Sequence, residues 1–499
     1  MTGTSHLRIF VLISCLSLCL TGCTVGPDFK SPPAPQTQSY TESDLPEKTV
    51  ESKGPGGDAQ VFLQGKDIPG CWWYLFHSKS LNELIEIALK NSPNLQAAQA
   101  AFREGEANLR LALSAIYPSI TFQAYPERQR FSGAIFGIQS TTGPITFNLY
   151  YASVNASYTL DTFGGIRRQI ESSEAQLAYQ QFEVEATYLT LTSNIVTTAI
   201  TEASIRAQIQ ATEELISAQA GILEITRKKF NLGGASRLDI LAQETQLAQT
   251  QASLPPLQNS LAKTRHALAV LVGELPSESC LPSFSLNELH LPKELPVSLP
   301  SSLVCQRPDI RAAEALLHSA SAQIGVATAN MLPQITLTGN VSLLSDVFKT
   351  LFDYKSFIWS AMSNLTQPIF QGGALIAKRD AAIAAFEQAC FQYQQTVLQA
   401  FQNVADTLKA LEIDAHQLQI QTAAEEAASK TLGLTETQYK LGAVSYLSLL
   451  DADRQYHQAR IGRIQAQAAR YADTAALFQA LGGGWWNRNA PCKVPEKNE

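Results

Sequence analysis

The stretch FNLGGASRLDIL, residues 230–241, returns as YKLGAVSYLSLL at residues 439–450. Five residues recur at a constant offset of 209 positions: Leu232, Gly233, Ser236, Leu238 and Leu241 meet Leu441, Gly442, Ser445, Leu447 and Leu450. A glycine after a helical pattern is typical of a helix stop, and a serine that follows it is a good N-cap for the next helix. The stretch therefore predicts a turn between two helices, with Gly233 and Gly442 as structural glycines, and the chain contains it twice.

A long helix is predicted before each turn. No proline occurs from Ile166 to Phe230 or from Ala374 to Tyr439. One seven-residue apolar register runs through both segments, with these members: Tyr188, Ile195, Ile209, Ile216, Leu223 and Phe230, then Val397, Val404, Leu411, Leu418, Leu432 and Tyr439. Glu202 interrupts the first series and Glu425 the second. The register predicts coiled-coil packing, and at 1.5 Å per residue each helix reaches roughly 100 Å. Return helices are expected over 238–272 and 447–481.

The duplication extends upstream of these helices. Pro93 and Pro118 in the first half match Pro308 and Pro333 in the second, 25 residues apart in each case. The first proline of each pair suits position N1 of a helix, and the second marks its stop. A Pro-rich linker at 274–302 separates the halves, so the predicted repeats are 71–273 and 303–486, with a tail at 487–499.

Each repeat also has two stretches of strand character. They are SITFQAYPERQR (119–130) and FNLYYASVNASYTL (147–160) in the first, and QITLTGNVSLL (334–344) and FIWSAMSNLTQPIF (357–370) in the second. Their length and imperfect alternation indicate transmembrane β-strands, although a small soluble hairpin in each repeat gives a similar pattern. Glycine pairs end the second strands, and we expect them to permit the change from strand to helix: Gly164 and Gly165, then Gly372 and Gly373.

The N-terminus is predicted to be a signal peptide at 1–22 with a lipid anchor. Arg8 precedes a short apolar run that ends in Leu20-Thr21-Gly22-Cys23, which resembles the bacterial lipobox. Acylation of Cys23 would then attach the chain to a membrane, and Thr24 in the next position resembles lipoproteins of the outer membrane. The alternative is an ordinary signal peptide. Residues 23–70 are expected to form the anchor and an extended Pro-rich spacer.

Composition excludes several classes of protein. The net charge of −7 gives no basic footprint for nucleic acid, and no later segment approaches the roughly 20 apolar residues of a membrane-spanning helix. No phosphate-binding loop, nucleophile elbow or metal-ligand spacing is present, so we predict neither an enzyme nor a cofactor. Five cysteines follow the lipobox, namely Cys71, Cys280, Cys305, Cys390 and Cys492, and Cys280 and Cys305 flank the linker and are candidates to pair.

Four membrane strands cannot close a barrel, and an open sheet edge in lipid leaves backbone groups unsatisfied at several kcal/mol each. The chain is therefore expected to oligomerise, and two, three or four copies all satisfy this argument. The predicted fold class is α+β, mainly α: long helical hairpins forming an α-barrel, plus four strands per chain in a shared transmembrane β-barrel. Such an assembly is a conduit.

The chain resembles the TolC-like outer membrane efflux proteins, in their lipoprotein branch of NodT/OprM type. The resemblance rests on LTGC (20–23), WWYLFHSKSLNELIEIALKNSPNLQAA (72–98), QRPDIRAAE (306–314), the glycine turns and YKLGAVSYLSLLDADR (439–454). It implies a homotrimer with a twelve-stranded barrel in outer membrane lipid and a periplasmic α-barrel. It also implies two partners, a periplasmic adaptor protein and an inner membrane pump of the resistance-nodulation-division type.

The resemblance also implies a gate at the hairpin tips. Asp451 falls where the family has a gate aspartate, Ser448 replaces a second aspartate, and Val444 stands where some members have an arginine. Asp239, the counterpart of Ser448, is a candidate replacement charge. Tyr439, Tyr446, Leu447 and Leu450 are the other candidate gate residues. Each acid has the alternative of being a solvated charge near a helix turn.

The leading hypothesis is a gated, passive exit duct for drugs or other small molecules. Two alternatives remain open at this stage: a duct for secreted proteins, and a periplasmic coiled-coil adaptor or structural lipoprotein whose strands never enter lipid.

Overall fold

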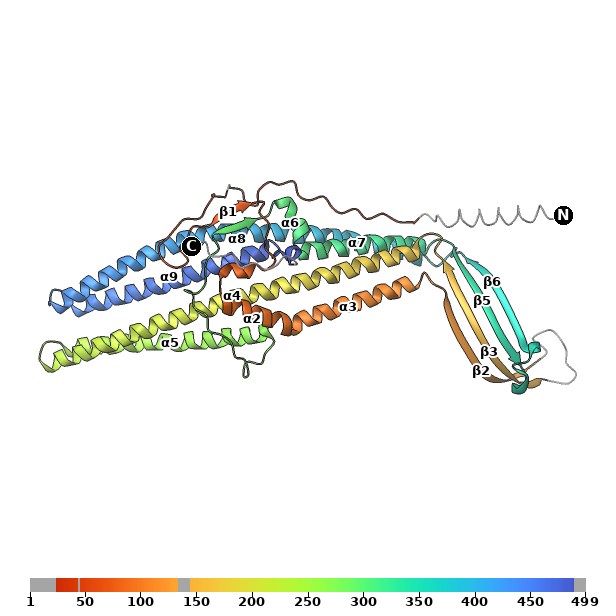
Figure 1. The fold of residues 1–499 in the computed structure, drawn as a ribbon, viewed down its shortest axis with the longest axis horizontal. Helices are drawn as coiled ribbons and strands as arrows, with labels where there is room; N and C mark the ends of the chain where they lie inside the picture. The colour runs from red at the N-terminus through yellow and green to blue at the C-terminus, as the bar shows by residue number, and fades with distance from the viewer. Residues whose placement is uncertain (1–23, 44, 133–143, 489–499) are drawn as a thin grey trace. The chain divides into compact units, whose positions relative to one another are not determined.

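The computed structural model describes residues 24–43, 45–132 and 144–488, and it divides into two compact units (Figure 1). One unit comprises Met1–Ser31, Arg103–Tyr179 and Ala313–Tyr393, and the other comprises Pro32–Phe102, Gln180–Ala312 and Gln394–Glu499. Each repeat of the sequence thus contributes to both units. The predicted signal peptide, the lipidation site Cys23 and the tail residue Cys492 lie outside the described residues.

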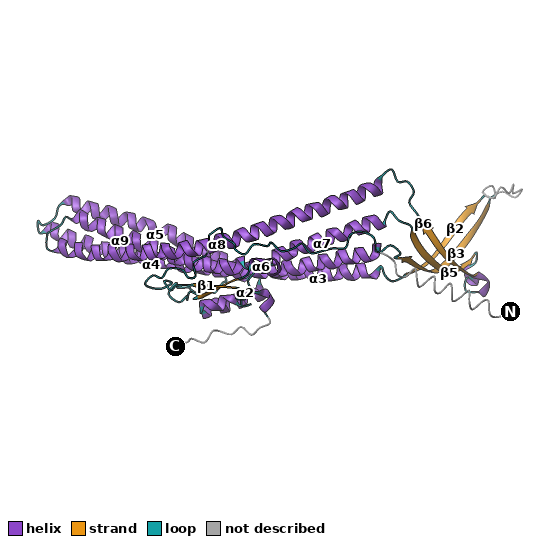
Figure 2. Ribbon diagram, turned by 90° about the horizontal axis from the view of Figure 1, so that it is seen from above, coloured by secondary structure: helices purple, strands orange, loops and turns teal. Residues whose placement is uncertain are grey.

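The first unit contains a four-stranded antiparallel sheet (Figure 2). Its strands are β2 (Ser119–Phe131), β3 (Ile145–Leu160), β5 (Gln334–Ser345) and β6 (Phe357–Thr366), in the order β2-β3-β5-β6. All four predicted strands are confirmed, but β6 ends at Thr366, whereas the prediction ran to Phe370. Pro368 has no N–H to donate to a ladder, which explains the earlier end.

The strand register separates an apolar from a polar face of the sheet. Val154 pairs with Phe122 on one side and with Val341 on the other, and Val341 pairs with Trp359. In the adjacent row, Asn155 pairs with Asn340, whose side-chain amide donates a hydrogen bond to the Asn155 carbonyl oxygen. Successive residues of a strand point to opposite faces, so the two rows lie on opposite faces.

Two helical hairpins are present, as predicted (Figure 1). The first pairs α4 (Gly165–Asn231) with α5 (Arg237–Val272), and the second pairs α8 (Ala374–Lys440) with α9 (Tyr446–Ala480). The helices α4 and α8 each have 67 residues. Pro255 and Pro256 lie inside α5, although proline generally breaks a helix interior. None of the described helices combines the length and hydropathy needed to cross a membrane.

Shorter elements complete the two units. The helices α3 (Pro93–Ser114) and α7 (Pro308–Ala329) both begin at a proline, which confirms the predicted N1 positions. The remaining elements of both units are η1 (Trp72–Phe76), α2 (Lys79–Asn91), α6 (Pro300–Gln306), η3 (Phe348–Thr350), η4 (Tyr354–Ser356), η5 (Trp485–Asn487) and the parallel pair β1 (Val61–Gln64) and β4 (Glu294–Val297).

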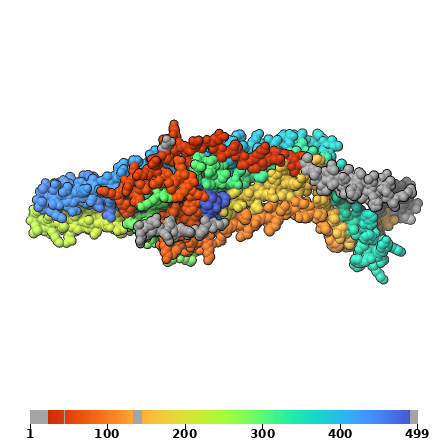
Figure 3. Space-filling view, turned by 45° about the horizontal axis from the view of Figure 1, so that its top comes forward, coloured from red at the N-terminus to blue at the C-terminus, as the bar shows by residue number. Residues whose placement is uncertain are grey.

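The spacer is extended but is held against the second unit. Arg470 of α9, which is fully buried, donates hydrogen bonds to Thr49 Oγ1, to the Gly56 carbonyl and to the Asp58 carbonyl at 2.7–3.0 Å. In Figure 3 this red segment covers the helices of the unit. A buried guanidinium is costly unless its donors are satisfied, so these contacts fix the spacer in place.

The two acids that interrupt the heptads are both paired. Glu202 is fully buried, and its carboxylate accepts hydrogen bonds from Arg206, from Arg265 and from the Phe284 backbone N–H. Glu425 forms an ion pair with Arg463 of α9. Both interruptions are therefore polar contacts, fully buried at Glu202 and partly exposed at Glu425.

The cysteines correct one prediction. Cys280 and Cys305 are both exposed free thiols, so the candidate pairing between them is wrong. Cys390 also forms no disulfide, whereas Cys71 is disulfide-bonded.

Candidate functional site at the hairpin tips

The first hairpin turns through a left-handed glycine. Gly233 has a φ of 80°, and the backbone N–H of Gly234 donates to the Lys229 carbonyl at 2.8 Å. Ser236 then caps α5 in a capping box, in which the Asp239 carboxylate accepts hydrogen bonds from the Ser236 backbone N–H and hydroxyl, both at 2.8 Å. The carboxylate of the candidate gate residue Asp239 is therefore engaged in capping the N-terminus of its own helix.

The second tip repeats this turn without the acidic partner. Gly442 has a φ of 77°, and Ser445 caps α9 by accepting a hydrogen bond from the Ser448 backbone N–H at 3.3 Å. Ser448 stands in the position that Asp239 occupies in the first tip. Its hydroxyl lies 3.0 Å from the Ser445 hydroxyl, which is a weaker arrangement than a capping box with a carboxylate.

An aromatic pair in the second hairpin contacts a lysine of the first hairpin. The rings of Tyr439 and Tyr446 meet edge to face with their centroids 5.8 Å apart. The Lys229 ammonium, at the end of α4, lies 4.3 Å from the Tyr439 ring centroid. A cation at this distance from an aromatic face is attracted by about 0.5–1 kcal/mol at an exposed site. The pair therefore connects α8 and α9 to the first hairpin.

A buried amide–carboxylate contact forms a second link. The Gln219 side chain of α4 donates to Asp453 Oδ2 of α9 at 2.9 Å, and only 6% of Asp453 is exposed. The side-chain amide of Gln243 in α5 donates in turn to the backbone carbonyl of Gln219 at 2.9 Å. Burial raises the pKa of the Asp453 carboxyl, and the nearby Glu436 charge raises it further. This contact ties three helices together near the tips.

Two further polar contacts continue the link away from the tips. Arg460 of α9 forms an ion pair with Glu214 of α4 at 2.7 Å, and the hydrogen bond from Arg460 lowers the pKa of the Glu214 carboxyl. The Gln465 amide donates to Gln208 Oε1 at 3.2 Å. The hairpins of one chain are thus joined at several successive levels of α4 and α9.

Asp451 lies in a more open environment. Its carboxylate accepts hydrogen bonds from Arg454 at 2.8 Å and from Gln455 at 2.7 Å, and all three residues are exposed. A cavity of about 430 Å³ lies beside it, lined by Leu447, Ser448, Leu450, Asp451, Arg454 and Gln246 of α5. The structure therefore brings three of the candidate gate residues, Asp451, Leu447 and Leu450, to one cavity.

Both tips also expose apolar side chains. The most exposed leucines are Leu232 at 87%, Leu441 at 80%, Leu238 at 74% and Leu447 at 70%. Leucines grouped in this way at the ends of helices are typical of a surface that contacts another protein.

Sequence analysis missed four residues of this site: Lys229, Gln219, Leu449 and Asp453. Leu449 is buried, whereas the neighbouring candidates Leu447 and Leu450 are not. A signal for Asp453 existed, because Tyr446, Leu449 and Asp453 follow the i, i+3, i+7 spacing of one helix face. An acid on a buried face is more informative than the exposed acid two residues before it.

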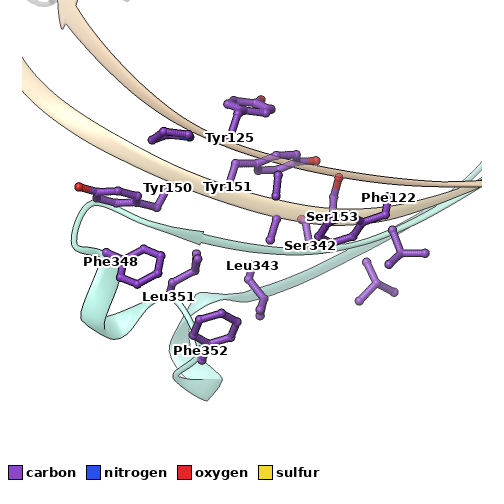
Figure 4. Close-up of a pocket in the computed structure, with 15 residues that line it drawn as sticks. Phe122, Tyr125, Tyr150, Tyr151, Ser153, Ser342, Leu343, Phe348, Leu351 and Phe352 are labelled. Atoms are coloured by element: carbon purple, nitrogen blue, oxygen red, sulfur yellow. The ribbon is translucent and has the colours of Figure 1, made fainter.

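The sheet carries a second cavity, of about 500 Å³ (Figure 4). Phe348, Leu351 and Phe352, from the loop between β5 and β6, lie below Tyr150 and Leu343 of the sheet. The side chains that line the cavity carry no charge, and the polar ones are serines and tyrosines. This lining offers no charged group that would bind an ion.

Comparison with known proteins gives consistent results. The family model for outer membrane efflux proteins matches residues 84–274 and 299–483. The pyoverdine export outer membrane protein OpmQ of Pseudomonas putida is 31% identical over 421 residues, which are 83% of this chain and 88% of that protein. The cation efflux system protein CusC of Escherichia coli O6:H1 is 29% identical over 94% of this chain and 98% of that protein. The solved structure of the outer-membrane channel OprN superposes with a TM-score of 0.82 at 25% identity, over 93% of this chain and 100% of that chain.

Proposed function

The chain belongs to the outer membrane efflux protein family, and from that premise we propose that three copies form one conduit whose periplasmic mouth is closed by the hairpin tips. The protein is an outer membrane channel of an efflux system, with a periplasmic helical extension, and is not an enzyme. The copy number, the partners and the residues of the gate are the proposed part.

The open sheet is the observation that carries the proposal. β2 and β6 each have a neighbour on one side within the described chain, so two edges of backbone N–H and C=O groups await partners. In lipid each unsatisfied group costs several kcal/mol, which a closed ring of strands from several copies avoids. Three copies supply twelve strands. The polar face with Asn155 and Asn340 would then line the lumen, and the apolar face with Phe122 and Trp359 would meet lipid.

The long helices support the same assembly. The helix α8 exposes apolar side chains in two runs with intervals of seven or eight residues, namely Ile376, Ile383, Phe391 and Leu398, and then Ile413 and Ile420. A stripe with this spacing fits the face of a neighbouring helix. The stripe would be buried between copies of the chain.

The gate is proposed at the tips. In the closed form, Asp451 and the cavity formed with Leu447 and Leu450 face the pore, and Tyr439 and Tyr446 support the turn from behind. The Gln219–Asp453 contact holds the two hairpins of one chain together. Opening requires the hairpins to separate, so the free energy of these contacts sets the closed population.

Partners are proposed from the exposed leucines and from the relatives. Leu232 and Leu441 offer each tip an apolar contact for a periplasmic adaptor protein, which would connect the channel to an inner membrane pump of the resistance-nodulation-division type. The relatives are named for the export of cations and of pyoverdine, so we propose that the cargo is a small solute chosen by the pump. The match of an efflux family model to both halves favours a channel over an adaptor, and the relatives favour small cargo over secreted protein.

The anchor is proposed at Cys23. Its acylation would add to the membrane attachment provided by the strands, since each buried CH₂ of an acyl chain contributes about 0.8 kcal/mol.

Imaging of the purified particle in detergent, together with its mass, tests the assembly. We expect particles with threefold symmetry, and a stable monomer would contradict the proposal. Planar bilayer recordings test the duct itself. The native channel should conduct weakly and variants of the tip contacts strongly, whereas the absence of conductance from both would exclude a conduit.

A further inference from the structure

The residues that follow Cys23 are held by a buried arginine of the first unit. Arg168, in the first turn of α4, is 5% exposed, and its guanidinium donates to the Val25 carbonyl at 3.1 Å, the Gly26 carbonyl at 3.4 Å and Asp28 Oδ1 at 2.6 Å. Glu171 accepts its remaining hydrogen bond at 2.7 Å. A buried guanidinium whose donors are divided between one carboxylate and a chain segment is a built contact rather than a chance one.

Two glycines leave the space that the segment occupies. A Cβ on Gly325 of α7 would lie 2.7 Å from Arg168 Cγ and 2.9 Å from the Val25 carbonyl oxygen. A Cβ on Gly164 would lie 2.7 Å from Thr24 Cγ2. Gly26 itself has a φ of 93°, and a Cβ there would lie 2.5 Å from Gly325 Cα. Glycine is therefore required on both sides of the contact.

Further contacts hold the segment on both sides of Arg168. The Val25 backbone N–H donates to the Phe163 carbonyl at 3.1 Å, and the Phe29 ring stacks on His318 of α7 at 4.3 Å. His318 in turn contacts Glu171 at 2.9 Å, so Glu171 bridges Arg168 and His318.

We propose that Gly164, Arg168 and Gly325 form a receptor for the chain's own mature N-terminus and fix the lipid-bearing residue beside the β3–α4 turn. This inference rests on the proposed acylation of Cys23. Adjacent Cα atoms are about 3.8 Å apart, so holding Thr24 beside Gly164 would limit how far an acyl group on the preceding residue could move from the end of β3. Released from the receptor, the anchor would be restrained only by the flexible spacer. Arg168 is thus a positioning residue for the anchor.

Tryptic cleavage after Lys30, in outer membrane fragments that carry the full chain, tests the receptor. Lys30 is exposed, and we expect cleavage there to be faster when the segment leaves its contacts with Arg168 and His318. We expect Gly26→Ala and Arg168→Met to speed this cleavage by at least about tenfold, because each change removes contacts that hold the segment closed. Gly54→Ala is the matched control, since Gly54 has a φ of 91° but a Cβ added there would meet nothing within 4 Å.

The outcomes separate the receptor from its premise. Unchanged cleavage in Gly26→Ala and Arg168→Met would overturn the receptor, and so would equal acceleration in Gly54→Ala, which would show general loosening. The melting temperature of the oligomer should be unchanged in Gly26→Ala. If Gly26 only stabilised the fold, the melting temperature would fall. Labelling with an alkyne fatty acid, compared between the native chain and Cys23→Ser, reports acylation independently of cleavage.

Discussion

The two helical hairpins of the molecule have nearly the same lengths, glycine turns and capping serines, but their paired acids lie at different levels and differ in burial. In the first hairpin Glu202 is buried where the second has Leu411, and in the second Glu425 is paired where the first has Ile216. Glu202 binds Arg265 and the linker at Phe284, whereas Glu425 binds Arg463 within its own hairpin. The duplicated apolar pattern gives both hairpins the same architecture. Their polar contacts differ, because Glu202 also binds the linker and Glu425 does not.

Replacing Glu202 with the residue of its counterpart is the strongest test of this difference. Glu202→Leu should lower the free energy of unfolding by about 3–5 kcal/mol, because Arg265 and the Phe284 N–H lose a buried charged partner. Chemical denaturation in detergent, followed by helical circular dichroism, measures the loss. Glu425→Ile is the matched change in the other hairpin and should cost less, since its ion pair is more exposed. Equal losses would show that the two acids have equivalent roles.

The contact between the hairpins comes next in expected effect. Asp453→Ala leaves the buried Gln219 amide without its acceptor, which destabilises the closed form by about 1–3 kcal/mol. The ratio of closed to open channels then falls about five- to a hundredfold. We therefore expect a large rise in open probability in planar bilayers. Gln219→Ala should give a similar rise, and the double variant should add little to either. Additive effects would mean that the two residues do not act through their mutual contact.

Acidity should favour the closed tips through the same carboxyl. Burial raises the pKa of Asp453 above its ordinary value of 3.8, and opening that exposes the carboxyl to water would return it towards that value. The closed form then binds the proton more tightly, so its advantage is greatest below 3.8 and is lost as pH rises through the raised value. Conductance should increase as the pH rises from 3.8 through the raised pKa of Asp453, and Asp453→Asn should flatten this dependence. An unchanged profile in Asp453→Asn would assign the effect to another group.

Asp451 should have a smaller effect than Asp453. Its ion pair with Arg454 is exposed, and exposed pairs contribute about 0.2–1 kcal/mol. Asp451→Ala should accordingly raise the closed-state leak by less than about fivefold. Single-channel recording at low and high salt checks this, because screening should reduce the difference. A rise as large as that of Asp453→Ala would make Asp451 the main gate residue.

The smallest expected effect concerns the caps. Ser448→Asp would give the second tip the capping box that Asp239 completes in the first, and this should stabilise α9 by about 0.5–1 kcal/mol. Hydrogen exchange of the first turn of α9 measures the change. Asp239→Ser is the reverse substitution and should weaken α5 to a similar extent. No difference in either tip would mean that the turn glycines alone determine the two ends.

The architecture was predictable because its signals are long and repeated. The 209-residue offset, the proline pairs and the four strand-like runs each predict an element that the structure contains. The site was predicted less well, because a fixed seven-residue register does not follow one face of a straight helix, which drifts by about 20° per heptad. Val397, Val404, Leu411 and Leu418 stay buried, whereas Ile209 and Ile216 are only partly buried and Leu215 and Gln219 take the interior.

The paired acids Glu202 and Glu425 also could not be assigned to contacts from the sequence. In the sequence, Glu202 and Glu425 interrupt an apolar series, yet each is paired with a residue far along the chain, and Glu202 is fully buried. A pairing between residues 82 positions apart, such as Glu202 and Phe284, leaves no periodic signal in the sequence. Asp453 was overlooked for a related reason, since its partner Gln219 belongs to the other repeat.

The proline pair inside α5 gives the two hairpins different mechanical properties. Pro255 and Pro256 have no N–H, so the carbonyls of Gln251 and Ala252 lack the hydrogen bonds that the equivalent positions of α9, Ile464 and Gln465, can donate. A helix bends most easily where its backbone hydrogen bonds are interrupted. If a partner docks on the tips as proposed, the first hairpin would bend more easily than the second, and each subunit would then have one compliant and one stiff hairpin.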